Sequence, residues 1–167
     1  MNTMKRVLIT GMSGAGKSSV IQELVERGYR SFDLDTPEWS EWVDANPGDD
    51  LTPADGKDWV WREDHVRTLL SQPDADLLFV GGCATNMDRL RPFIDLTILL
   101  SAPLATVMTR LEARSSNGYG RTLDERNKVV ELISTVEPLL RNNADHEIVT
   151  DRPVRATVDE ILRLSSS

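Results

Sequence analysis

Cysteine and histidine are scarce in this 167-residue sequence, which contains one cysteine, Cys83, and two histidines, His65 and His146. A lone cysteine cannot form an internal disulfide, so we expect the protein to work in a reducing cytoplasm. The histidines lie far in sequence from Cys83 and from each other, and this spacing does not predict a zinc site. The sequence therefore predicts neither a secreted domain held together by disulfides nor a module stabilised by zinc.

Long apolar runs and an excess of positive charge are also missing. No apolar run approaches the roughly 18 residues of a membrane-spanning helix, and the residues before Gly11 are too few for a secretory signal. The net charge is −8. Binding to a phosphate backbone needs a positive surface, so we predict neither a nucleic-acid partner nor membrane association. The length suits one soluble domain over residues 1–167, which we expect to be a monomer or a weak dimer.

Apolar segments alternate along the chain with segments of helical periodicity, and this alternation predicts an α/β fold. The apolar segments are continuous, as in parallel strands that are buried on both faces of a sheet. Helical periodicity begins near Lys17, recurs over 104–111 and continues as one long helix over 122–140. A last helix is expected after Pro153. The predicted strands are 7–10, 29–34, 77–80, 96–100 and 147–150.

The segment Gly11-Met12-Ser13-Gly14-Ala15-Gly16-Lys17-Ser18 matches the phosphate-binding pattern G-x-x-x-x-G-K-[ST]. It follows a predicted strand and opens a predicted helix, which is the context that this motif requires. Glycines allow backbone N–H groups to point at phosphate oxygens, and the helix N-terminus attracts the same anion. Lys17 is expected to reach the β- and γ-phosphates, and the Ser18 hydroxyl to bind Mg²⁺. We therefore predict ATP and Mg²⁺ as ligands, with the nucleotide contacted by Gly11, Ser13, Gly14, Ala15, Gly16, Lys17, Ser18 and Ser19.

Two aspartates, Asp33 and Asp35, follow the second predicted strand. Period-2 spacing would place both side chains on one face if the strand continued. The carboxyl ends of strands in this architecture meet at the ligand crevice. We assign Asp33 to Mg²⁺, through water, and Asp35 to the acceptor hydroxyl as an orienting group or base. A plain turn at Asp35-Thr36-Pro37 is the structural alternative.

Two polar segments interrupt the alternation of strands and helices. The first, 36–56, is rich in proline, glycine and aspartate and carries Trp39 and Trp42. Long loops in compact domains of this kind often serve function. We therefore expect an acceptor-binding region over 36–75 and a short lid over 115–122. Ordinary surface loops are the alternative for both segments.

With these motifs in place, the sequence resembles shikimate kinase and its relatives, which include gluconate kinase and adenylate kinase, over nearly its whole length. Beyond the phosphate loop, the resemblance rests on Asp33-Leu34-Asp35, on Gly81-Gly82-Cys83 after the third strand, and on Gly120-Arg121 in the lid. Trp59-Val60-Trp61-Arg62-Glu63 resembles the helix that carries an acceptor-binding arginine. The resemblance implies a three-layer P-loop kinase fold, with a five-stranded parallel sheet in the order 2-3-1-4-5 and helices on both faces.

The resemblance also implies roles on the nucleotide side of the site. Lys17 and Arg121 would neutralise the charge that develops on the transferred phosphoryl group. Arg110 would stack on one face of the adenine ring and Pro153 on the other. With Asp35 as the group that orients the nucleophile, Lys17 and Arg121 complete the predicted catalytic set.

On the acceptor side, Arg62 would bind an anionic group, because its planar guanidinium group can donate two hydrogen bonds to a carboxylate or phosphate. Gly81 and Gly82 would let backbone amides approach the acceptor. The sequence departs from shikimate kinases at 135–138, where a second carboxylate-binding arginine is missing, and at Cys83, which replaces the third glycine. We therefore expect an acceptor other than shikimate, which is another small hydroxylated metabolite, a nucleoside or a nucleotide.

Three functions remain open from the sequence. The first is an ATP- and Mg²⁺-dependent phosphotransferase that moves the γ-phosphoryl group to a hydroxyl of a small metabolite. The second is a nucleoside or nucleoside-monophosphate kinase, in which Arg62, Arg89 and Arg91 would surround the acceptor phosphate. The third is a non-catalytic nucleotide-binding switch, whose loops would change order with ATP.

Overall fold

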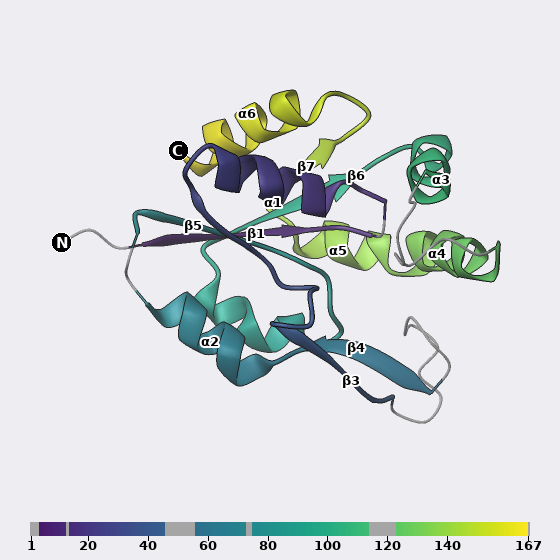
Figure 1. The fold of residues 1–167 in the computed structure, drawn as a ribbon, viewed down its shortest axis with the longest axis horizontal. Coiled ribbons are helices and arrows are strands. Elements are labelled where there is room, and N and C mark those ends of the chain that lie inside the picture. Colours follow the sequence, from purple (N-terminus) through teal and green to yellow (C-terminus); the bar gives the residue numbers. More distant parts are fainter. Residues whose placement is uncertain (1–3, 13, 46–55, 73–74, 114–122, 167) are drawn as a thin grey trace.

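The computed structural model describes residues 4–12, 14–45, 56–72, 75–113 and 123–166. At its centre is a five-stranded sheet with the strand order β2-β5-β1-β6-β7 (Figure 1). Its neighbouring strands are all parallel. These are the five predicted strands, so the predicted order 2-3-1-4-5 is confirmed. Their bounds are β1 (Lys5–Thr10), β2 (Arg30–Asp33), β5 (Leu77–Gly81), β6 (Leu96–Ser101) and β7 (His146–Val149).

The sheet is buried on both faces because successive apolar side chains of a strand point to opposite sides. From β1, Val7 and Ile9 enter one core cluster and Leu8 enters the other. Figure 1 shows helices α1 and α6 above the sheet and α2 below it, which is the predicted three-layer arrangement. The covering elements are α1 (Lys17–Glu26) and α6 (Val154–Ser165) on one face, and α2 (Glu63–Ser71) and the 3₁₀ helix η1 (Met87–Phe93) on the other.

Three further helices are α3 (Leu104–Glu112), α4 (Leu123–Thr135) and α5 (Glu137–Asn143). The prediction of one long helix over 122–140 is wrong, because the helix breaks at Val136 between α4 and α5. Pro138 explains the break, since proline has no N–H to donate to the preceding turn and is tolerated only in the first turn of the new helix α5.

An antiparallel hairpin of β3 (Ser40–Asp44) and β4 (Lys57–Trp61) lies beyond α2, below the sheet in Figure 1. The prediction of a helix over 59–63 is therefore wrong up to Trp61, and the predicted loop 36–56 contains a strand. Trp42 and Trp59 lie opposite each other in the hairpin with ring centroids 5.1 Å apart, and such cross-strand aromatic pairs stabilise a sheet. Residues 46–55 lie outside the described part of the chain.

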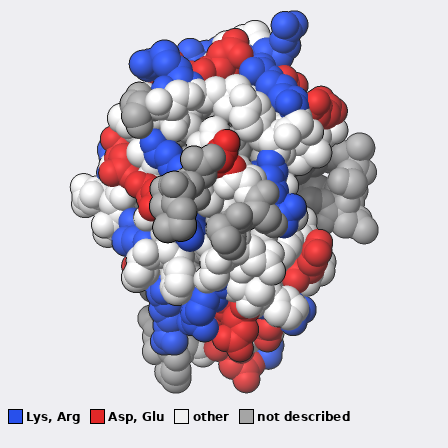
Figure 2. All heavy atoms as spheres, turned by 90° about the vertical axis from the view of Figure 1, so that its left-hand side faces the viewer, with Lys and Arg blue, Asp and Glu red and all other residues white. Residues whose placement is uncertain are grey.

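Basic and acidic side chains are interspersed on the face of the molecule where β1 begins (Figure 2). A surface that binds nucleic acid carries basic residues over a continuous area, so this face does not support such a role. Among the residues that the structure describes, no helix combines the length and apolar character needed to cross a bilayer.

Candidate active site

The phosphate-binding loop joins β1 to α1 at the carboxyl edge of the sheet. Gly14 and Gly16 have φ angles of 84° and 100°, in the left-handed region that other residues rarely adopt. A Cβ atom at Gly14 would also lie 2.7 Å from Val107 Cγ1 of α3. The loop therefore needs glycine at these positions to turn into the N-terminus of α1, where backbone N–H groups favour a bound anion.

The Lys17 side chain folds back over this loop. Its Nζ donates hydrogen bonds to Gly11 O at 2.5 Å and to Met12 O at 3.2 Å. The charge of Lys17 also acts on the carboxyl group of Asp35 and on the thiol of Cys83, where it favours the ionised forms. The lysine of the phosphate loop thus lies near enough to these two groups for its charge to act on both.

Arg110 of α3 ties the phosphate loop to the end of the sheet. Its guanidinium group donates to Gly14 O at 2.9 Å and to Thr150 Oγ1 at 3.0 Å, and also to Thr150 O. Thr150 Oγ1 in turn donates to Ala15 O at 2.6 Å. Pro153 follows three residues later, exposed at the start of α6. The structure therefore brings Arg110 beside the loop, while the stacking of adenine between Arg110 and Pro153 stays a prediction.

Ser18 and Asp33 meet at the other side of the loop, where Ser18 Oγ donates to Asp33 Oδ2 at 2.9 Å. A hydroxyl and a carboxylate are oxygen ligands of the kind that Mg²⁺ prefers, and this ion usually keeps several of its waters. Among the described residues, no group of three or more His, Cys, Asp and Glu side chains lies together as a metal cage. The pair therefore fits an ion held by Ser18 and, through water, by Asp33.

Asp35 lies beyond the end of β2, so it does not share a strand face with Asp33. The chain turns instead, and the Asp35 N–H donates to Asp33 Oδ1 at 3.0 Å. The Asp35 carboxylate accepts the Cys83 N–H at 3.2 Å, which anchors it to the turn after β5. Trp59 Nε1 donates to Asp35 O at 2.9 Å and fixes the main chain.

The pKa of Asp35 is raised, chiefly because burial disfavours the charged carboxylate. Lys17 lowers this pKa and the negative charge of Asp33 raises it, while the Cys83 N–H and the neighbouring Trp61 indole lower it. A carboxylate with a raised pKa accepts a proton more readily, which suits a general base.

Gly81 ends β5 and Gly82 follows it, and the two glycines make room for different groups. A Cβ atom on Gly82 would lie 2.8 Å from Asp35 Oδ1 and 3.1 Å from Trp61 Nε1. A Cβ atom on Gly81 would lie 2.8 Å from Ile21 Cγ1, in the core under α1. Gly82 therefore leaves room for the Asp35 carboxylate and Gly81 for the packing of a helix on the sheet, while the approach of an acceptor to their amides stays a prediction.

The sequence of the chain matches the model of one protein family. The family model described as AAA domain matches residues 7–134, which is more than half of the chain. The chain belongs to this AAA domain family. No sequence among the curated proteins matches it.

Solved structures share the fold of this AAA domain protein at low sequence identity. The shikimate kinase from Acinetobacter baumannii, in complex with shikimate, has a TM-score of 0.63 and 21% identity over 98% of this chain and 93% of its own. A gluconokinase from Sinorhizobium meliloti has a TM-score of 0.57 and 17% identity, over 99% and 96%. A sugar kinase from Janibacter sp. has a TM-score of 0.55 and 16% identity, over 96% and 93%. These likenesses confirm the predicted fold of the P-loop small-molecule kinase group.

The arginines predicted to meet an anionic acceptor are paired within this AAA domain. Arg62 precedes α2, where its Nη1 lies 3.1 Å from Glu41 Oε2 and its Nε donates to Pro37 O at 3.3 Å. Arg91 lies 2.8 Å from Asp88. Glu41 therefore neutralises the guanidinium group that the sequence predicted to grip an anion.

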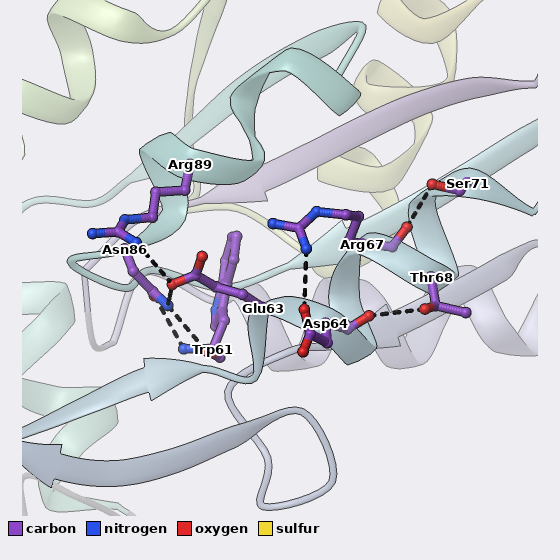
Figure 3. A network of polar contacts seen from close by, with 8 residues as sticks. All are labelled: Trp61, Glu63, Asp64, Arg67, Thr68, Ser71, Asn86 and Arg89. Atoms are coloured by element: carbon purple, nitrogen blue, oxygen red, sulfur yellow. Dashed lines mark hydrogen bonds and ion pairs between the residues drawn. The ribbon is translucent and has the colours of Figure 1, made fainter.

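Asn86 braces the junction of β4 and α2, as Figure 3 shows. Its Nδ2 donates to Trp61 O at 2.9 Å and to Glu63 Oε2 at 3.2 Å, and its Oδ1 accepts the Trp61 N–H at 3.1 Å. Arg89 lies 3.8 Å from the same Glu63 carboxylate. The arginines that a nucleoside-monophosphate kinase would use for its acceptor thus already contact carboxylates of the chain.

Sequence reasoning missed Asp58, a carboxylate of β4 that is only 7% exposed. The Thr85 hydroxyl donates a hydrogen bond to it from the loop after β5. Burial raises the pKa of the nearby Cys83 thiol, and the charges of Asp35 and then Asp58 raise it further. No local pattern identifies Asp58, because its burial depends on a loop that is distant in sequence.

Some predicted residues are not tested by this geometry. Ser13, Arg121 and the predicted lid at 115–122 lie outside the described residues. Ser19 is exposed in the first turn of α1, and its contact with nucleotide stays a prediction.

Alanine substitutions of Gly81 and Gly82 should distinguish a residue that shapes the site from one that supports the packing of the core. We expect Gly82→Ala to raise the acceptor KM at least about tenfold with a small change in Tm, because its Cβ would displace the Asp35 carboxylate or the Trp61 indole. Gly81→Ala should instead lower Tm by several degrees, because its Cβ overpacks the core at Ile21. Acceptor kinetics and thermal unfolding of both variants test this contrast, and a Gly82→Ala variant with unchanged kinetics would contradict it.

Proposed function

We propose that this protein is an ATP- and Mg²⁺-dependent phosphotransferase that moves the γ-phosphoryl group to a hydroxyl of a small molecule. The observation that carries the proposal is the shared site of Lys17 and Asp35. One is the phosphate-loop lysine, and the other is a half-buried carboxylate with a raised pKa, held by the Cys83 N–H. Phosphoryl transfer needs this combination of a cation at the phosphate and a group that orients the attacking hydroxyl.

On the donor side, the N-terminus of α1 and the N–H groups of the loop would bind the phosphates. Lys17 would exchange the carbonyls of Gly11 and Met12 for phosphate oxygens. Ser18, with Asp33 through water, would hold Mg²⁺, which when bound neutralises phosphate charge. Arg121, from the predicted lid, completes the proposed catalytic set.

On the acceptor side, Asp35 would accept the hydroxyl proton. The hydroxyl oxygen forms a bond to the γ-phosphorus, and the bond from that phosphorus to the bridging oxygen of ADP breaks. The products are ADP, the phosphorylated acceptor and a proton that leaves through Asp35. A carboxylate anchored by a backbone N–H keeps its position during this step, which favours in-line attack.

Coupled ADP release tests the proposal directly. Wild type is assayed with ATP and Mg²⁺ against shikimate, gluconate-type acids, sugars, nucleosides and nucleoside monophosphates, with Lys17→Ala as the blank. Turnover well above the blank with one acceptor class establishes the kinase. A flat panel, with ATP binding intact by calorimetry, would remove the kinase and favour the nucleotide-binding switch.

A further inference from the structure

Asp58 is a buried carboxylate that has no role in the proposed phosphotransfer. The side chain is 7% exposed, and its Oδ2 accepts the Thr85 hydroxyl from the loop after β5. A carboxylate held largely away from water is costly unless donors surround it, so this side chain favours a ligand that supplies a further donor. The position of Asp58 in β4 therefore needs a reason beyond folding.

Asp58 contacts the same loop as Asp35, the residue proposed to meet the acceptor hydroxyl. The Cys83 N–H donates to the Asp35 carboxylate, and Thr85, two residues later in this loop, donates to Asp58. The charges of Asp35, Asp58 and Lys17 all act on the thiol of Cys83. The loop that leaves β5 therefore joins Asp58 to the proposed site.

The Trp61 indole is a second buried polar group in this region. Trp61 is 2% exposed, and its Nε1 makes no hydrogen bond of good geometry within the described residues, although the indole lies near the Asp35 carboxylate and lowers its pKa. A Cβ atom on Gly82 would lie 2.8 Å from Asp35 Oδ1 and 3.1 Å from this nitrogen, so the carboxylate, the indole and the turn after β5 lie close together. The indole thus offers a neutral donor to an oxygen of a ligand that enters beside Asp35.

Within the described part of the chain, the two arginines next to β4 and α2 already contact carboxylates. Arg62 pairs with Glu41, and Arg89 contacts Glu63. Lys17 belongs to the phosphate side of the site. An acceptor with a carboxylate or phosphate would therefore face uncompensated negative charge from Asp58, which disfavours binding.

We propose that Asp58 and Thr85 form an acceptor subsite that binds hydroxyl or ammonium groups and rejects anions. The acceptor is then an uncharged or cationic polyhydroxylated molecule. This inference rests on the proposed phosphotransferase function and adds its substrate class. It differs from the expectation, drawn from the family resemblance, that Arg62 binds an anionic group of the acceptor.

Matched acceptors that differ only in charge test the inference. We would compare gluconate with glucitol and glucamine, shikimate with methyl shikimate, and AMP with adenosine, using kcat/KM for each. Where a pair is phosphorylated, the uncharged or cationic member is expected to exceed the anion at least about tenfold. Higher kcat/KM for the anionic members would overturn the inference and leave the kinase proposal intact.

Asp58→Asn is the decisive variant, because asparagine keeps the shape and removes the charge. For the preferred neutral acceptor we expect KM to rise about tenfold, with kcat within about threefold of wild type and an unchanged KM for ATP. The ratio of anionic to neutral kcat/KM should rise by a similar factor. Asp44→Asn, an exposed change on the paired strand β3, is the matched control and should alter neither value.

A binding measurement separates this inference from the kinase proposal. Fluorescence of the nearby tryptophans, with a non-hydrolysable ATP analogue present, reports binding of glucitol, methyl shikimate and adenosine without turnover. Weaker binding to Asp58→Asn than to wild type supports the subsite even if no product forms. Thr85→Ser keeps the hydroxyl and should bind as wild type does, whereas Thr85→Val should resemble Asp58→Asn. Equal binding to Asp58→Asn and wild type, or no binding of any member, would overturn the inference.

Discussion

Replacement of Lys17 by alanine is expected to lower kcat by on the order of 10³-fold or more. In the structure the lysine ammonium already lies over the phosphate loop, where it is held by Gly11 O and Met12 O. During transfer, negative charge develops on the phosphoryl oxygens, and a pre-positioned cation stabilises it without further reorganisation. Alanine removes that charge and leaves the carbonyls exposed toward the phosphate, so KM for ATP should rise as well.

The fold should survive this change. The shape of the loop depends on the left-handed glycines Gly14 and Gly16 and on the bond from Arg110 to Gly14 O, and none of these involves the lysine side chain. We expect Tm to stay within a few degrees of wild type. Lys57→Ala, which removes an exposed lysine that pairs with Asp44, is the matched control and should keep full activity. Steady-state kinetics that show Lys17→Ala within tenfold of wild type would contradict the assignment.

The phosphate loop and the burial of the sheet could be predicted because their causes are local or repetitive, whereas the strand order followed from the family resemblance. The loop motif specifies its own backbone through glycines at Gly14 and Gly16, whose left-handed φ angles the structure confirms. Continuous apolar strands specify burial on both faces whatever their partners. The end of α1 at Gly28 is equally local, since its φ of 90° is one that glycine adopts without strain after the last turn of a helix.

The acceptor side could not be predicted because its residues depend on contacts between distant segments. The segment Trp59-Val60-Trp61 is short and aromatic, and such a run suits strand as well as helix until a partner strand is known. Its partner, β3, lies in a segment whose prolines and glycines predict a loop. The resemblance singled out Arg62 as an acceptor-binding residue, which stays a prediction, but it did not indicate the ion pair of Arg62 with Glu41 across the hairpin.

Replacement of Asp35 by asparagine should lower kcat by about 10²- to 10⁴-fold, the range typical for loss of a general base. Asparagine retains an oxygen for the Cys83 N–H, so the geometry of the turn should persist. The loss is then chemical, and KM for ATP should change little. An Asp35→Asn variant with more than a tenth of wild-type kcat would show that the carboxylate takes no part in the reaction.

The same variant should be more stable than wild type at neutral pH, and the sign follows from the raised pKa of Asp35. In the unfolded chain an aspartate titrates near about 3.9. Between that value and the raised folded pKa, the folded protein binds more protons than the unfolded chain, so wild-type stability falls as pH rises through this window. Asparagine does not titrate, so the Tm of Asp35→Asn should exceed that of wild type at pH 7 and the difference should shrink toward pH 4.

The activity of wild type should also depend on the ionisation of Asp35, but activity should fall as pH is lowered, whereas stability should rise. Because the base must be deprotonated, kcat/KM of wild type should fall as pH is lowered through the raised pKa, above the ordinary range of aspartate. Asp33→Asn offers an internal check on thermal unfolding, since loss of the neighbouring negative charge lowers the pKa of Asp35. In that background the stabilising effect of Asp35→Asn at pH 7 should be smaller. An Asp35→Asn variant that is inactive and also less stable at every pH would mean that Asp35 holds the fold together and that its loss of activity is a structural effect.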